Sequence, residues 1–170
     1  MVQAQGRKER QMYKAMILAT VFGAALAGAP GGPCAAQTVL DGSAAHVAGA
    51  AEAMKKVAAT LAHPQGARFR HLAAHSVDGA GVVCGEVAET PAHDATFAQF
   101  GYVAGHDDPI VFANRPVPAV IPFGEVNGWI NDSVHLEDLE EMGCAPKGSY
   151  HAYSEKLNTK MNQRRQYGVN

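Results

Sequence analysis

The chain has 170 residues, of which 14 are Lys or Arg and 16 are Asp or Glu, and its formal net charge is −2. This length suits one ordinary domain with its own core. Nucleic-acid-binding domains usually carry a basic patch or stripe, so the acidic balance argues against DNA or RNA as a partner.

The first 36 residues have the layout of a secretory signal peptide. A basic lead (residues 7–14) precedes an uncharged apolar run (15–27), a breaker rich in Pro and Gly (29–33) and three small residues (34–36). This order of charge, apolar segment, breaker and small-residue exit is typical of secretory signals. We therefore expect cleavage after Ala36 and a mature protein in the periplasm or outside the cell.

Two alternatives to a cleaved signal are less well supported. A spanning helix needs about 20 apolar residues, whereas the apolar run covers residues 15–27 only, so we expect no integral membrane span after processing. A lipid anchor on Cys34 would want an aliphatic residue three positions earlier, where Gly31 stands. Translation from Met12 or Met16 instead of Met1 would leave the same mature chain.

Residues 37–149 are predicted to form one small α+β domain, and residues 150–170 a polar tail that is helical or disordered. Removing residues 1–36 takes four of the 14 basic and one of the 16 acidic residues, which leaves 134 residues with a formal net charge of −5. Residues 43–62 predict an amphipathic helix, because apolar residues recur at every third or fourth position. Ser43 is its candidate N-cap, and Pro64 ends it.

Four short runs rich in Val, Phe and Tyr follow this helix. Turn-forming Gly, Pro and Asp residues separate the runs, which predicts a three- or four-stranded antiparallel meander with the helix packed on it. The runs are residues 68–77, 82–89, 97–103 and 110–112.

A second, short helix is predicted at residues 133–142. Prolines at positions 116, 118 and 122 predict that residues 114–130 form a loop or an edge segment before it. Asp132 or Ser133 can cap the helix, and Gly143 is the expected residue at its C-terminal end.

Three segments between residues 63 and 102 resemble a known family. They are His63–Arg70 (HPQGARFR), Val82–Val87 (VVCGEV) and the aromatic strand at 97–102. They resemble small secreted or lipid-anchored proteobacterial proteins of unknown function, in which "D-P-x-S-A-x-F-R" precedes "V-C-G-E-V-N". This chain departs from that pattern at His63, Gly66 and Ala88. The resemblance implies an envelope location and no established activity.

Cys84 and Cys144 are the cysteines that remain once Cys34 leaves with the signal peptide. Two cysteines in an oxidising compartment usually pair. Cys84 lies in a predicted strand, and Cys144 follows the glycine that ends a helix, where the chain commonly turns back toward the apolar face. We therefore predict a Cys84–Cys144 disulfide. A reactive thiol is the alternative, but the chain has no C-x-x-C spacing to favour it.

The candidate metal ligands are His93, His106 and Asp107. They lie in turns between predicted strands and would supply nitrogen and oxygen ligands if those turns meet. His71 and His75 have H-x-x-x-H spacing, but residues four apart in a strand are separated by roughly 13 Å. The loop residues are therefore the better candidates.

The sequence contains no enzyme signature of the G-x-S-x-G, Walker, G-x-G-x-x-G or H-E-x-x-H type. We predict no catalytic residue and no cofactor. We expect Glu86 on the solvated face of its strand and Trp129 as a lid over the sheet. The expected function is that of a non-enzymatic envelope accessory or binding protein whose partner is an envelope protein or a small ligand. The alternative is a soluble periplasmic protein that binds a metal or small ligand through loop His and Asp residues.

The exported protein should begin at Gln37. Intact-mass measurement of protein recovered from the periplasm or medium should give the mass of residues 37–170, with one disulfide. A mass increased by acyl chains on Cys34, or an unprocessed leader in the membrane fraction, would contradict cleavage after Ala36.

Overall fold

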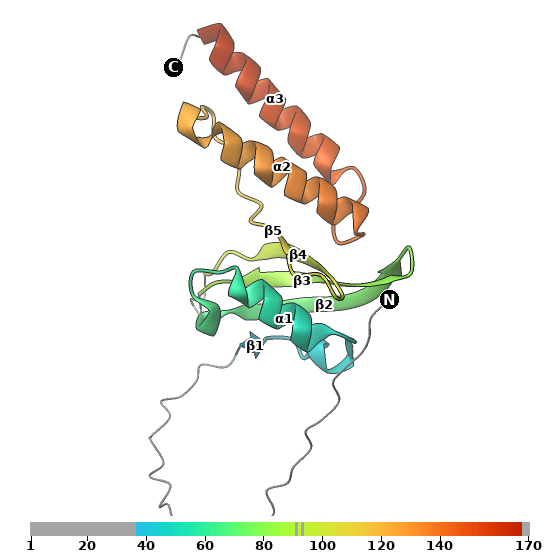
Figure 1. The fold of residues 1–170 in the computed structure, drawn as a ribbon. Helices are drawn as coiled ribbons and strands as arrows, with labels where there is room; N and C mark the ends of the chain where they lie inside the picture. Colours follow the sequence, from blue (N-terminus) through green and yellow to red (C-terminus); the bar gives the residue numbers. More distant parts are fainter. Residues whose placement is uncertain (1–36, 91, 93, 168–170) are drawn as a thin grey trace, which may run out of the picture. The chain divides into compact units, whose positions relative to one another are not determined.

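The computed structural model describes residues 37–90, 92 and 94–167, so the predicted signal peptide lies outside the described residues. Its helices and strands confirm the predicted α+β class (Figure 1). In chain order the elements are β1 (Thr38–Val39), the 3-10 turn η1 (Ser43–His46), α1 (Ala50–Ala59), η2 (Pro64–Gly66), β2 (Arg68–Val77), β3 (Ala80–Ala88), β4 (Ala98–Val103), β5 (Ile110–Phe112), η3 (Phe123–Glu125), α2 (Val126–Glu141) and α3 (Ser149–Tyr167).

The strands form one sheet in the order β1-β2-β3-β4-β5. Strands β2 to β5 pair as antiparallel neighbours, as in the predicted meander. Strand β1 is an additional strand, parallel to β2, and the N–H groups of Thr38 and Leu40 donate to the carbonyls of Ala67 and Phe69 beside it. The prediction of three or four purely antiparallel strands was wrong in this detail, because a two-residue strand has no alternation to detect.

Helix α1 is shorter than the helix predicted over residues 43–62. The chain first makes η1 and then passes through Gly49, whose φ of +79° is a left-handed conformation that favours glycine. Ser43 does not cap α1, because its Oγ donates to the Asp41 carboxylate at 2.6 Å and accepts the N–H of Leu72. These bonds tie η1 to β2 and separate it from the helix.

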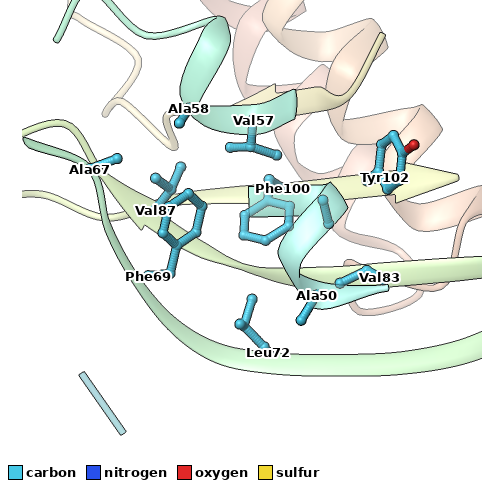
Figure 2. Packing of buried hydrophobic residues seen from close by; sticks show 11 residues of the cluster. Ala50, Val57, Ala58, Ala67, Phe69, Leu72, Val83, Val87, Phe100 and Tyr102 are labelled. Atoms are coloured by element: carbon cyan, nitrogen blue, oxygen red, sulfur yellow. The ribbon is translucent and has the colours of Figure 1, made fainter. Parts of the chain in front are cut away.

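Helix α1 covers one face of the sheet through a buried apolar cluster (Figure 2). The rings of Phe69 on β2 and Phe100 on β4 meet edge to face, with centroids 5.8 Å apart. Gly85 on β3 pairs with Phe100, and a Cβ there would lie 2.7 Å from the Leu72 side chain and 2.8 Å from the Phe100 ring. The cluster consists of Ala50, Ala53, Val57, Ala58, Ala67, Phe69, Leu72, Val83, Val87, Phe100 and Tyr102.

Helix α2 packs against the opposite face of the sheet, and α3 lies alongside α2 (Figure 1). Successive side chains of a strand point to opposite faces, and Gly101, next to Phe100, is the residue that α2 approaches. A Cβ at Gly101 would lie 2.7 Å from the Met142 side chain and 2.9 Å from Leu139. The second buried cluster consists of Phe112, Ile121, Trp129, Leu136, Leu139, Ala145, Tyr153 and Leu157.

Helix α2 begins at Val126, so the prediction of a loop over residues 114–130 was wrong from η3 onward. Trp129 is buried in the second cluster, and the Arg115 guanidinium lies 4.4 Å above its ring. The Asn-Gly pair before Trp129 favours a loop by local propensity. It is helical here because tertiary packing around Trp129 overrides that propensity. Ser133 is inside the helix and does not cap it; its hydroxyl hydrogen-bonds Ser154.

The end of α2 follows the prediction. Gly143 has a φ of +72°, and the N–H of Cys144 donates to the carbonyl of Leu139 at 2.7 Å. The predicted disulfide between Cys84 and Cys144 is confirmed, with its Cα atoms 5.2 Å apart. It joins β3 to the residue that follows this helix end.

Most of the segment predicted to be a helical or disordered tail lies in α3. Tyr153 and Leu157, four residues apart, are buried against α2 and β5 as part of the second cluster. Among the described residues, no helix is both long and apolar enough to cross a membrane.

Replacing Gly85 by Ala should destabilise the protein by about 1–3 kcal/mol, because the new methyl group would overpack the contact with Leu72 and Phe100. Gly81→Ala in the same strand is the matched control, since its Cβ would lie 3.7 Å from Ala104, and its stability should stay within about 0.5 kcal/mol of the parent. Urea unfolding of both variants measures the difference. Equal midpoints would show that Gly85 is not required for close packing.

Candidate binding groove

A groove of ≈ 420 Å³ lies on the side of the sheet that faces α2. Sites for small ligands usually have volumes of about 300–1,000 Å³ and mostly apolar walls. The floor of this groove is apolar, with one residue from each of four strands and one from the end of α2. These residues are Val77, Val82, Val103, Ile110 and Met142.

The rim of the groove carries four carboxylates and one imidazole. Asp78 comes from the β2–β3 turn, His106 and Asp108 from the β4–β5 loop, and Asp138 and Glu141 from α2. None of the residues that line the groove is Lys or Arg. The rim therefore has a strongly negative charge above an apolar floor.

The rim carboxylates differ from most other carboxylates of the protein in lacking partners. Fifteen of the 16 Asp and Glu residues are in the described ranges. Six of these have no side-chain hydrogen bond or ion pair with another described residue, and four of the six are on the rim. The nine that accept one are Asp41, Glu52, Glu86, Glu89, Asp107, Glu125, Asp132, Glu140 and Glu155.

The position of Asp138 and Glu141 near the end of α2 strengthens the negative field. The C-terminus of a helix carries the negative end of its dipole, where a cation is worth about 0.3–1 kcal/mol. No basic residue stands in the last turn of α2. Sequence reasoning concentrated on histidines and missed this acidic helix end, although the run of acids without a basic residue was a usable signal.

The end of α2 is held above the sheet by His75 as well as by the disulfide. His75 Nε2 donates to the carbonyl of Met142 at 2.7 Å, and Nδ1 lies 3.9 Å from Cys84 Sγ. The last turn of α2 is thus attached to β2 through the imidazole and to β3 through the disulfide. These attachments position one wall of the groove.

The structure describes two of the three predicted metal ligands, and these two have different surroundings. His106 is on the groove rim, whereas Asp107 pairs with Lys56 of α1 at 2.5 Å. Their hydrogen bond lowers the pKa of Asp107 and raises that of Lys56. His93 lies outside the described residues, so the metal site stays a prediction. Within the described ranges, no three His, Cys, Asp or Glu side chains are grouped so as to hold a metal ion.

Glu86 lies on the same face of the sheet as the groove but is fully engaged. Its carboxylate pairs with Arg70 Nε at 2.5 Å, and His71 Nδ1 lies 3.5 Å from the same oxygen. Arg70 also stacks over the ring of Phe97 at 3.7 Å. The arrangement links β2, β3 and the residue before β4, so Glu86 is a partly buried ion-pair partner and not the freely solvated side chain that the sequence predicted.

Comparison of the chain with protein-family models, with curated protein sequences and with solved structures gives no match. The candidate site therefore rests on the geometry and charges of this chain alone.

Replacing both Cys84 and Cys144 by Ala should lower the free energy of unfolding by about 4 kcal/mol, the chain-entropy value for a closed loop of this length. Amide exchange should then accelerate first in the last turn of α2 and in Cys144–Ala145, because the covalent attachment of the groove wall is lost. Urea unfolding and hydrogen exchange measure the two effects. A loss below about 1 kcal/mol with unchanged exchange would mean that packing alone fixes the wall.

Proposed function

We propose that this protein is a non-enzymatic binding protein of the bacterial envelope, and that it holds a cationic group with an apolar stem in the groove. One observation carries the proposal: four carboxylates that have no partner among the described residues surround an apolar floor. Such a site matches a ligand whose cation meets the rim while its hydrocarbon part covers the floor. A lysine side chain and an alkylammonium ion both have this chemistry.

The energetics favour a modest affinity. Each exposed carboxylate–ammonium pair contributes about 0.2–1 kcal/mol, and each buried methylene of the stem adds about 0.8 kcal/mol before the cost of association is subtracted. The groove is open and its rim is solvated, so salt should weaken binding. We therefore expect millimolar binding of a single alkylammonium ion.

The proposed location draws on two features. The N-terminal sequence has the layout of a secretory signal, and disulfides persist chiefly in oxidising compartments. The Cys84–Cys144 bond supports an extracytoplasmic location for the mature protein. The absence of an enzyme signature from the sequence supports a binding role for the groove.

Hexylamine is a suitable probe for this proposal. Hexanol and hexanoate are the comparison compounds, because they have a six-carbon chain with a neutral or a negative head group. Hexylamine should shift the NMR signals of Val82, Val103 and Ile110, whereas hexanol should bind more weakly and hexanoate should not bind. The double variant Asp138→Asn/Glu141→Gln should weaken hexylamine binding by about two- to thirtyfold, at 0.2–1 kcal/mol for each carboxylate.

Glu137→Gln is the matched control, because Glu137 is an α2 carboxylate without a described partner that does not line the groove. Its hexylamine affinity should equal that of the parent. Equal affinity for hexylamine and hexanol, or an equal loss in both the double variant and the control, would disprove recognition of a cation at this rim.

A further inference from the structure

The outer edge of β2 has partners along only part of its length. Strand β1 pairs with Arg68 and Phe69 alone. The Asp41 carboxylate then accepts the N–H of His71 at 2.6 Å, and Ser43 Oγ accepts the N–H of Leu72 at 3.0 Å. Hydrogen bonds from Ser43 and His71 lower the pKa of Asp41 to about 2, so this carboxylate remains a charged acceptor.

Beyond Leu72, the described residues supply no outer partner for the backbone of β2. Residues Ala73 to Val77 pair with β3 on the inner side only. Val77 pairs with Ala80 across a two-residue turn, so the N–H and C=O groups of Val77 point inward to β3. Peptide groups alternate along a strand, so the N–H and C=O groups of Ala74 and Ser76 point outward. This stretch is an open sheet edge.

The side chains of this edge do not protect it. Natural edge strands are commonly blunted by Lys, Pro or a bulge, which prevent another chain from pairing with them. The residues here are Ala73, Ala74, His75 and Ser76, and all four are exposed. The bulge of β2 lies earlier, between Arg70 and Ala73, so it does not interrupt the open stretch.

The open edge leads directly into the groove. Val77, the last residue of β2, lies on its floor, and Asp78 follows on its rim. The bond between His75 and the Met142 carbonyl places the acidic end of α2 above this part of β2. A strand added outside β2 would therefore turn every second side chain toward the carboxylates, with about 7 Å between successive ones.

We propose that the ligand is a basic segment of a partner protein, which adds as a strand to the edge Ala73–Val77 and directs alternate Lys or Arg side chains to the groove rim. This inference rests on the proposed function, because the same carboxylates bind the cations. The backbone of β2 supplies affinity and the rim supplies selectivity for basic residues, as in other cases of strand addition.

An acetylated and amidated hexapeptide of alternating Val and Lys is the probe, compared with hexylamine and with the same peptide N-methylated at every residue. The unmodified peptide should bind at least tenfold more tightly than hexylamine, and hydrogen exchange should show new protection at Ala74 and Ser76. The N-methylated peptide keeps its charges but cannot donate to the edge, so its affinity should fall at least tenfold.

Ser76→Pro removes one outward donor without removing a bond to β3, a substitution that edge strands tolerate. This variant should lose about tenfold in peptide affinity and keep its hexylamine affinity, which also shows that it is folded. The double variant Asp138→Asn/Glu141→Gln should weaken the binding of both hexylamine and the peptide.

Three results would overturn strand addition while leaving the proposed function intact: peptide affinity no greater than that of hexylamine, no protection at Ala74 and Ser76, or equal binding of the N-methylated peptide. If the protein forms concentration-dependent dimers, and if these protect the Ala74 and Ser76 amides from exchange without peptide, the edge binds a second copy of this chain and strand addition by a basic partner is overturned. Failure of hexylamine to bind would instead overturn the proposed function itself.

Discussion

The attachment of the end of α2 to the sheet is the constraint on which the groove depends. Cys144 follows the helix end directly and is bonded to Cys84 on β3, while His75 on β2 holds the carbonyl of Met142. Gly101 permits this approach, because a side chain there would meet Cys144 Sγ at 3.0 Å. Four of the five floor residues belong to the strands whether or not the helix is attached. The rim is different, since two of its four carboxylates are held above the floor only because the helix end is fixed.

The acidic residues near the end of α2 have two roles. One carboxylate hydrogen-bonds the next helix, and two others line the groove. The Glu140 carboxylate accepts the N–H groups of Gly148 and Tyr150 at the start of α3, and these bonds lower its pKa. It therefore caps the next helix, where a negative charge is favourable. Asp138 and Glu141 make no such bond with a described residue and face the groove at the negative end of their own helix. A bound cation would offset a repulsion that the fold itself does not relieve.

Local sequence signals located the central strands, because alternation and turn residues report directly on half-buried strands. They also located the disulfide, since two cysteines remain once the predicted signal peptide is set aside. They failed at α2, where an Asn-Gly pair and preceding prolines obscure a turn that is held by packing around Trp129. Local sequence signals could not predict the groove, for a different reason. Its rim combines a hairpin turn, a loop and a helix end, and nothing local indicates that these meet. The pairing of Asp107 with Lys56, 51 residues away, illustrates the same limit.

Two of the three segments behind the resemblance, His63–Arg70 and Val82–Val87, meet where β2 pairs with β3. Phe69 pairs with Val87 and Arg70 with Glu86, so the aromatic–basic pair of one segment meets the acidic–aliphatic pair of the other. Gly85, between Cys84 and Glu86, makes room for the ring of Phe100. Each of these residues has a packing, covalent or ion-pair role. The four rim carboxylates lie outside the motif. The motif residues therefore build the sheet, whereas the proposed binding depends on residues outside the motif.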